Sequence, residues 1–393
     1  MNKETIKELA SKYFNEIIDI RRHLHQFPEL SFQEHKTSKY ISGILTKWNI
    51  NHSIGYANTG IVAIIEGKNP QSNVVALRAD FDALPIQEEN KVDYCSKNDG
   101  IMHACGHDAH TSSLLGTVRI LNDLKDNLTG TVKFIFQPAE EMIPGGAKQM
   151  IEEGVMDKPK VKYMFGQHVF PDLEVGMVGF CPGKYMASTD ELYFTIKGKG
   201  GHAAIPEKNI NPIVIGSILI QKLYEHFDKE KNRPSVFSIG YINGEGSTNI
   251  VPDIVSLKGT FRCMDERFRS LSHRKMLEIC DFTQSNHNVK IELNIKKGYP
   301  YLENDVTLTT KAISYAKEFL SESQIVELPI RMTAEDFSYY TRHAPSCFYR
   351  LGTANKKKGI THGLHTSRFD IDEKSLEIGM GLMSWIAIRT LEN

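Results

Sequence analysis

The feature that most constrains the fold is the alternation of apolar strand patterns with helical patterns in the first half of the chain. The segments VVALRAD (74–80), TVKFIFQ (131–137) and YMFGQHV (163–169) read as strands, and helical patterns separate them. The first of these is nearly continuous in apolar residues, as a strand buried on both faces of a sheet requires. This order predicts an α/β fold.

The order of the predicted strands and helices changes after roughly Gly183. Between 185 and 297 the patterns run strand, helix, strand, strand, helix, strand, which is the order of a ferredoxin-like unit. After this stretch helix and strand alternate again, and a chain of 393 residues is long enough for two domains. We therefore expect a larger α/β domain formed by 1–184 and 298–393, with a ferredoxin-like domain inserted at 185–297.

Composition argues against several classes of partner. The net charge of -1 leaves no basic excess to neutralise phosphates, so no nucleic acid is expected to bind. No apolar run approaches the roughly 20 residues that span a bilayer, so no membrane is expected either. The N-terminal segment lacks the apolar core of a signal peptide. The 6 cysteines are scattered without the rhythm of a disulfide scaffold, which favours a reducing cytoplasm.

Polar side chains gather where the predicted strands end. Asp80 and Asp82 follow the first strand, Glu140 and Glu141 follow the second, and His168 closes the third. In open α/β sheets, binding sites lie outside the carboxyl ends of the strands. We therefore expect these side chains to share one site.

The segment MHACGHDAH (102–110) adds a dense group of metal-binding side chains. Cys105 and His107 stand two positions apart, so an extended or turn backbone aims both at one ion. Thiolate and neutral imidazole suit Zn, Mn, Co or Ni. His103 and His110 are also ligands by chemistry, and their spacing does not exclude them. The alternative is a set of structural histidines.

The carboxylates near this segment suggest distinct roles. In FQPAEE, one of Glu140 and Glu141 can bind metal while the other takes a proton from an activated water. Asp80 or Asp82 can bind metal or orient a ligand imidazole. The alternatives are a solvated acidic turn for the glutamates and a capped turn for the aspartates.

Other chemistries find less support in the sequence. It contains no GxSxG, HExxH or P-loop motif. A cysteine hydrolase that uses Cys105 with His107 as its base remains an alternative. A non-catalytic metal- or peptide-binding protein is another, but such a protein would not need Glu140.

With these residues identified, the chain resembles the aminoacylase and carboxypeptidase G-like metallopeptidase family, peptidase family M20. It is most similar to the amidohydrolase branch, which contains hippurate hydrolases, N-acyl-amino-acid deacetylases and auxin-conjugate hydrolases. The motifs that carry this resemblance run nearly end to end: RADFDALP, MHACGHDAH, FQPAEE, GKGGHAAIP, TNIVPD, GTFR, AEDFS and LHTSRF. The resemblance implies a di-metal, zinc-peptidase-like catalytic domain and makes the inserted domain a lid that also forms a homodimer.

The resemblance also implies roles for individual residues. The implied ligands of two divalent ions are Cys105, His107, Glu141, His168 and His365. Cys105 would bridge the two ions and Glu140 would be the general base. His103 and His110 would then be structural residues or support the ligands.

Further roles follow for residues away from the ligands. Asp82, with Asp80 as the alternative, would support a ligand. His202, from the partner subunit, would polarise the scissile carbonyl, and Asn249 and Arg262 would grip the substrate carboxylate. The chain departs from similar proteins at Glu207, where a His is common, and at Asn211, where an Asp is common. These departures affect the expected substrate preference rather than the reaction.

The expected function is hydrolysis of N-acyl-L-amino acids, small molecules with acetyl, benzoyl or similar acyl groups, by a metal-activated water. A dipeptidase or carboxypeptidase of the same family is the alternative within this chemistry.

Overall fold

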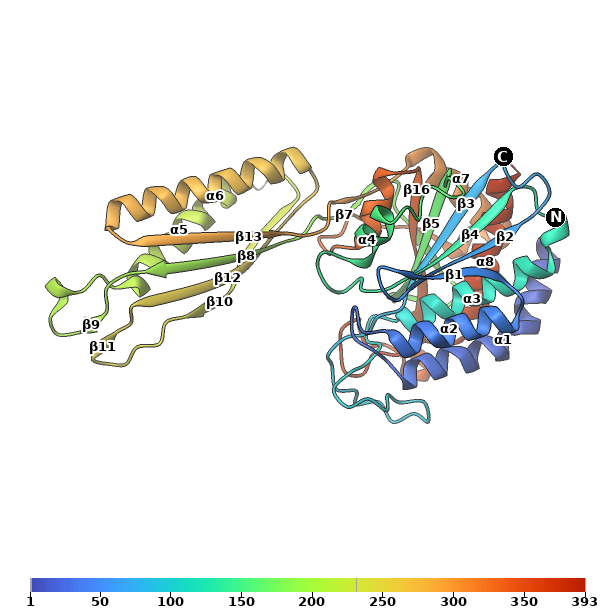
Figure 1. Ribbon diagram of the computed structural model, residues 1–393, viewed down its shortest axis with the longest axis horizontal. Helices are drawn as coiled ribbons and strands as arrows, with labels where there is room; N and C mark the ends of the chain where they lie inside the picture. The colour runs from blue at the N-terminus through green and yellow to red at the C-terminus, as the bar shows by residue number, and fades with distance from the viewer. Residues whose placement is uncertain (1, 231, 393) are drawn as a thin grey trace. The chain divides into compact units, whose positions relative to one another are not determined.

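The computed structural model describes residues 2–230 and 232–392 (Figure 1). The chain divides into two compact units. The large unit comprises Met1–Gly183, Glu303–Pro329 and Asp336–Asn393, and the small unit comprises Lys184–Leu302 and Ile330–Glu335. The chain passes between them within the short strands β7 (Gly183–Met186) and β14 (Leu302–Asn304), and again before Ile330 and after Glu335. No helix of the described residues is both long and apolar enough to cross a membrane.

The large unit is built on an eight-stranded sheet in the order β1-β2-β4-β3-β5-β16-β6-β15. Its strands are β1 (Asn51–Tyr56), β2 (Gly60–Glu66), β3 (Val74–Asp80), β4 (Thr131–Gln137), β5 (Tyr163–Glu174), β6 (Val178–Phe180), β15 (Ile325–Glu327) and β16 (Ser346–Ala354). Its helices are α1 (Lys3–Gln26), α2 (His35–Lys47), α3 (His107–Asp123), α4 (Gly146–Glu152), α7 (Val306–Phe319) and α8 (Lys374–Leu391). The predicted α/β class is confirmed.

The centre of this sheet is parallel and buried. β3 pairs in parallel with β4 and β5, and β5 pairs in parallel with β16. Every residue of β3, β4 and β16 is buried, and α3 and α8 pack against the central strands. The apolar composition of these strands therefore reflects burial on both faces.

Two element boundaries differ from the sequence-based expectation. His168 does not close its strand, because β16 pairs with β5 as far as Glu174 and holds the chain extended. The extended or turn backbone expected for Cys105 and His107 ends at Gly106, because α3 begins at His107. Gly106, just before it, has a φ of 81°, and a Cβ there would lie 2.5 Å from Val169 Cγ2. Glycine thus lets the start of α3 approach β5 closely.

The small unit has the element order of a ferredoxin-like fold. Its main elements are β8 (Asp190–Lys197), α5 (Pro212–Lys229), β10 (Ser235–Asn243), β12 (Ile254–Cys263), α6 (Glu266–His287) and β13 (Lys290–Lys297). The antiparallel sheet order is β10-β12-β8-β13, and α5 and α6 pack on it around one apolar cluster. A short ribbon of β9 (Gly201–His202) and β11 (Ile250–Val251) extends the unit at one end (Figure 1).

One of the two unusual residues of this unit has a structural explanation. Asn211 is the N-cap of α5, and its side chain accepts a hydrogen bond from the Ile213 amide at 3.0 Å. Asn and Asp are equally good N-caps, so this departure from similar sequences preserves the start of the helix. Glu207 lies exposed in the short 3-10 helix that precedes α5.

A buried ion pair stabilises the small unit and gives the first prediction. Arg269 of α6 donates from Nε to Asp190 Oδ2 at 2.9 Å and from Nη2 to the Thr189 and Gly298 carbonyls. Burial alone raises the pKa of Asp190, but hydrogen bonds from His273 and Arg269 outweigh it and lower this pKa. Removing the guanidinium would leave the Asp190 charge buried with less compensation.

We expect Arg269→Met to lower the free energy of unfolding of the small unit by about 3–5 kcal/mol. Denaturant titration followed by circular dichroism measures this change. Arg267 is an exposed residue of the same helix, so Arg267→Met is the matched control and should change stability by less than about 0.5 kcal/mol. Equal unfolding of the two variants would contradict this account of the ion pair.

Candidate metal centre

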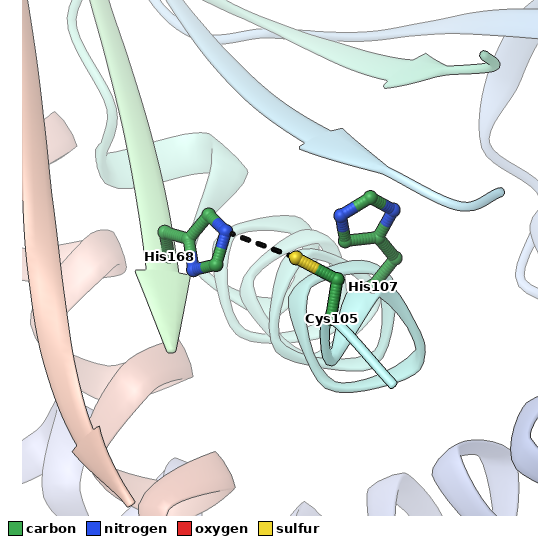
Figure 2. Close-up of side chains that lie close together, drawn as sticks. All are labelled: Cys105, His107 and His168. Carbon is green, nitrogen blue, oxygen red and sulfur yellow. Dashed lines mark hydrogen bonds between the residues drawn. The ribbon is translucent and has the colours of Figure 1, made fainter. Parts of the chain in front are cut away.

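Three of the five predicted ligands meet at the start of α3. Cys105, His107 and His168 are buried, and one donor atom of each lies within 4.8 Å of the others. Cys105 Sγ lies 3.5 Å from His168 Nε2 (Figure 2). The turn before α3 supplies Cys105, the first residue of α3 is His107, and β5 supplies His168. The arrangement is suited to one divalent ion.

A second group of donors shares Cys105 with the first. Cys105, Glu141 and His365 also offer donor atoms that lie within 4.8 Å of one another. His365 Nε2 is 3.3 Å from Glu141 Oε1, and the His365 side chain is 52% exposed. The loop that carries His365 places it here with a φ of 60°. The shared cysteine is the arrangement expected of a bridging ligand.

Two atoms of these groups lack the hydrogen bonds that buried polar atoms normally make. His107 Nε2 and Glu141 Oε1 are buried and have no hydrogen-bond partner among the described residues. The other ring nitrogen, His107 Nδ1, lies 3.0 Å from Asp82 Oδ1. A ligand imidazole typically shows this pattern, with one nitrogen held by a carboxylate and the other left for the metal. The residues present therefore fit a metal centre.

The electrostatic environment differs among the ligands. Burial lowers the pKa of His168 well below its usual value, so this imidazole is neutral, as a ligand must be. Burial raises the pKa of Cys105, and the Glu141 charge adds to this effect. The nearby Cys105 and Glu141 side chains raise the pKa of His365 to about 10. Metal binding would displace protons from this cysteine and this histidine.

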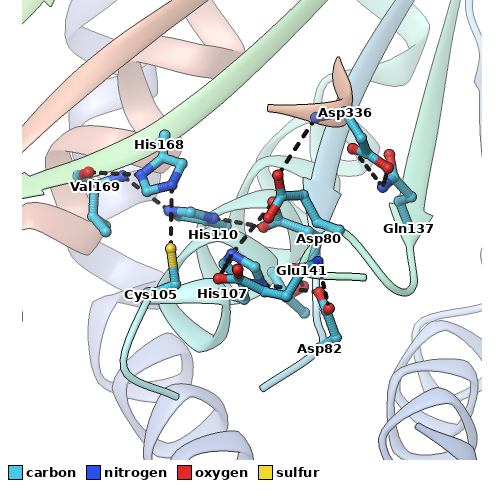
Figure 3. A network of polar contacts seen from close by, with 12 residues as sticks. Asp80, Asp82, Cys105, His107, His110, Gln137, Glu141, His168, Val169 and Asp336 are labelled. Carbon is cyan, nitrogen blue, oxygen red and sulfur yellow. Dashed lines mark hydrogen bonds and ion pairs between the residues drawn. The ribbon is translucent and has the colours of Figure 1, made fainter. Parts of the chain in front are cut away.

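The two aspartates near β3 have different partners. Asp82 orients His107, and its second oxygen accepts hydrogen bonds from the Ser31 hydroxyl (2.6 Å) and the Glu141 amide (3.0 Å). Asp80 contacts His110 Nδ1 at 2.6 Å (Figure 3), and its Oδ2 lies 3.7 Å from His107 Nε2. Asp82 therefore supports two of the predicted ligands directly.

The two remaining histidines of the cluster lie differently. His110 Nε2 accepts a hydrogen bond from the Val169 amide at 2.9 Å, so with Asp80 on its other nitrogen it ties α3 to β3 and β5. His103 is buried, neither ring nitrogen has a partner among the described residues, and it belongs to no donor group found there. Burial lowers the pKa of His103 to about 4. Neither residue takes a ligand position in the two groups that share Cys105.

Glu140 is buried beside this centre. Its carboxylate lies with His107 and Glu141 in one group, and its Oε1 accepts a hydrogen bond from the Asp336 amide at 3.4 Å. Asp336 is itself held by Arg78 (2.8 Å) and by Gln137 (2.9 Å), as Figure 3 shows in part. Sequence reasoning did not single out these supporting residues, although RADFDALP, FQPAEE and AEDFS contain all three.

A second buried network joins the start of α3 to α1. Arg21 Nε donates to Asp108 Oδ2 at 2.7 Å, and His25 Nδ1 lies 2.8 Å from the same oxygen. All three side chains are buried. Because Asp108 directly follows His107, this network holds the first turn of α3 against α1. Sequence reasoning did not single out this network.

His202, Asn249 and Arg262 lie in the small unit, in two separate places. His202 and Asn249 are exposed at the β9–β11 ribbon, where the Ala203 amide donates to the Asn249 carbonyl at 3.0 Å. Arg262 stands next to the last residue of β12, whereas β11 precedes the start of that strand. At about 3.3 Å per residue, β12 puts Arg262 roughly 26 Å from the first residue of the strand. One copy of the chain does not bring Arg262 to Asn249.

The family model described as peptidase family M20/M25/M40 matches residues 76–388. The chain belongs to this family. The recognition made from the sequence motifs is confirmed, and the matched range includes the predicted ligands together with Glu140 and the small unit.

Individual relatives extend over most of the chain. The N-acetylcysteine deacetylase of Bacillus subtilis is 37% identical, with 98% of this chain and 99% of that protein covered. The N-acyl-L-amino acid amidohydrolase of Geobacillus stearothermophilus is 40% identical over 76% of this chain and 80% of that protein. The crystal structure of Bacillus subtilis YXEP, described as a dinuclear metal binding peptidase, has a TM-score of 0.83 and 34% identity and covers 97% of this chain and 99% of its own.

Proposed function

We propose that the protein is a metal-dependent amidohydrolase that cleaves N-acyl-L-amino acids to a carboxylate and a free amino acid. The observation that carries this proposal is the pair of donor groups that share Cys105, with the buried Glu140 beside them. The names of the similar deacetylase and amidohydrolase support the same reaction.

The residues that would hold two divalent ions form two groups. Cys105, His107 and His168 make the first, and Cys105, Glu141 and His365 make the second. The ions, when bound, supply Lewis acidity that polarises the scissile carbonyl and makes a water easier to deprotonate. Mn, Zn, Co and Ni all accept this mixture of sulfur, nitrogen and oxygen donors.

Residues of the chain transfer the proton, orient a ligand and stabilise the charge that develops on the substrate. Glu140 accepts a proton from the attacking water and returns it to the leaving amine, which is the role of a general base and then a general acid. Asp82 keeps the His107 imidazole in the orientation that leaves Nε2 toward the donor group. His202 would donate a hydrogen bond to the carbonyl oxygen as charge develops on it.

This arrangement disfavours a cysteine hydrolase and leaves a dipeptidase or carboxypeptidase as the alternative. A cysteine hydrolase needs a thiol whose pKa is lowered, whereas burial raises the pKa of Cys105. A dipeptidase or carboxypeptidase of the same family would use the same centre and differ only in the substrate it accepts. The cytoplasmic location remains a prediction from the cysteine pattern.

A substrate panel tests the proposed function. Metal-reconstituted enzyme would be assayed on acetyl-, benzoyl- and indoleacetyl-amino acids and on dipeptides, with release of the free amino acid as the readout. We expect kcat/KM for at least one class of N-acyl amino acid to exceed the value for every dipeptide. The reverse order would favour the dipeptidase, and no turnover of any member would overturn the proposal.

Arg262 gives a prediction about the substrate carboxylate. It is partly buried, its Nη1 donates to the Met332 carbonyl at 3.2 Å, and no carboxylate among the described residues pairs with it. A planar guanidinium in this state is suited to a carboxylate. We expect Arg262→Ala to raise KM for N-acyl amino acids by about tenfold to a hundredfold.

The same variant should also lose discrimination against the amide and methyl-ester forms of the substrate. Lys258, an exposed residue of β12, is the control, and Lys258→Ala should leave KM unchanged. Retention of the discrimination by Arg262→Ala would remove this arginine from the substrate site.

The separation of Arg262 from Asn249 supports a homodimer. If both bind one substrate carboxylate, they come from different copies of the chain, and His202 accompanies Asn249. β10 is an edge strand with exposed Val236 and Tyr241, and an unpaired edge is a ready route to pairing between copies. We therefore propose that His202 acts on the active site of the partner subunit.

Mixing two inactive variants tests this arrangement. When Glu140→Gln and His202→Ala exchange subunits, one site of each heterodimer has both residues intact, so about a quarter of all sites should regain activity. Glu140→Gln mixed with Glu141→Gln is the control and should stay inactive, because both residues act in one subunit. An inactive first mixture, with heterodimers verified by native mass spectrometry, would show that His202 does not act across the dimer.

A further inference from the structure

A buried carboxylate from the N-terminal part of the chain contacts the segment that carries the general base. Glu34 is fully buried at the start of α2. Its Oε1 accepts a hydrogen bond from the Ala139 amide at 2.9 Å, and Ala139 directly precedes Glu140. The two residues are far apart in sequence, so only the folded chain brings them together.

Ala139 has a backbone conformation that needs support. Its φ is 53°, in the left-handed region that L-residues other than glycine, asparagine and aspartate seldom adopt. A conformation of this kind persists when surrounding contacts hold it. The Glu34 carboxylate supplies such a contact, and the Gly146 amide donates to the Ala139 carbonyl at 3.0 Å.

The amide on the other side of Glu140 is held in the same way. The Glu141 amide donates to Asp82 Oδ2 at 3.0 Å. The amides of the two residues that flank Glu140 therefore donate to buried carboxylates, one from Glu34 and one from Asp82. Asp82 also orients His107, but Glu34 belongs to neither donor group that shares Cys105.

We propose that Glu34 is a positioning residue for the reaction, whose carboxyl oxygen holds the Ala139 amide and thereby sets the place of the Glu140 carboxylate. The inference rests on the proposed role of Glu140 as general base. Its physical basis is reach: Oε1 must accept from the Ala139 amide while Oε2 accepts from the Thr59 hydroxyl, also at 2.9 Å.

The charge of Glu34 is less important than its reach. Burial, with a contribution from the Asp82 charge, raises the pKa of Glu34 to about 7. The Glu34 side chain accepts hydrogen bonds from the Phe32 amide, the Ala139 amide and the Thr59 hydroxyl. A glutamine keeps an oxygen for the two amides and can donate from its nitrogen to Thr59. An aspartate keeps the charge but is one methylene too short to make all three bonds.

Two substitutions therefore separate reach from charge. We expect Glu34→Gln to keep kcat within about threefold of the wild type and Glu34→Asp to lower kcat by about tenfold to a hundredfold, because small displacements of a catalytic group are costly. KM and metal content should stay unchanged in both. Thr59→Val removes only the contact to Oε2 and is the control for general loosening of this region, with kcat within about threefold.

A second background tests whether Glu34 acts through Glu140. In Glu140→Gln the base is absent, so adding Glu34→Asp should change the remaining rate by less than about threefold. The same loss in both backgrounds would overturn the proposal, because Glu34 would then act on the fold as a whole. A folded Glu34→Gln, verified by its melting temperature, with kcat lowered tenfold or more would overturn it as well. Full activity of Glu140→Gln alone would instead refute the proposed base, which makes the two failures distinguishable.

Discussion

Removal of metal is expected to abolish hydrolysis completely, and Mn, Co, Ni or Zn should restore it. The physical reason is that His107 Nε2 and Glu141 Oε1 are buried without hydrogen bonds among the described residues, so an ion is the partner that satisfies them. Activity before and after chelation, with metal content from elemental analysis, measures the effect. Full activity in a preparation verified as metal-free would refute a metal-centred reaction.

Cys105→Ala is the variant that should lose the most metal, because its sulfur belongs to both donor groups. Cys280 is a buried cysteine of the small unit, and Cys280→Ala should keep its metal.

Metal affinity should also rise with pH. The Cys105 thiol has a raised pKa and the pKa of His365 is about 10, so both groups must lose protons to bind. An affinity independent of pH would contradict this ligand assignment.

Glu140→Gln should lower kcat by about two to four orders of magnitude while the metal is retained. The amide keeps the shape of the side chain and still accepts the hydrogen bond from the Asp336 amide, but it cannot take up a proton from water. Single-turnover kinetics and elemental analysis on the same sample separate the loss of the base from the loss of an ion.

Glu141→Gln is the matched comparison, since it makes the same chemical change one position along. Glu141 Oε1 lies 3.3 Å from His365 Nε2 and belongs to the group that contains Cys105. A neutral amide is a poorer ligand than a carboxylate, so this variant should lose one ion. If Glu140→Gln is the metal-depleted variant, the roles of the two glutamates are reversed.

The sequence predicted the parts of the fold that depend on local pattern. Segments rich in apolar residues predicted the observed bounds of β3 and β4, because a strand buried on both faces carries few polar side chains. The change in the order of strand and helix patterns after Gly183 likewise indicated the ferredoxin-like element order. The predicted end of β5 was wrong by several residues, because the extension of this strand to Glu174 depends on pairing with the distant β16.

The same distinction between local pattern and tertiary contact applies to the candidate site. Potential ligands are recognisable from chemistry and spacing, so Cys105 and His107 stand out in nine residues of sequence. Supporting residues are not recognisable in this way. Glu34 and Arg78 carry ordinary charged side chains, and nothing in their neighbours shows that they are buried against Ala139 and Asp336. Their roles depend on hydrogen-bond partners that only the folded chain brings within reach, because a buried polar group without partners is costly.

The sequence by itself therefore determined the fold class, the family and the residues that have ligand or base chemistry, because these follow from local pattern and from side-chain type. The tertiary structure alone decided which of these residues share an ion-sized space and which are held apart. It grouped Cys105 with two sets of donors, placed Asp82 at His107 Nδ1 and Asp80 at His110 Nδ1, and separated Arg262 from Asn249 along one strand. Distances between groups far apart in sequence are set by sheet order and by helix packing, which no single segment encodes.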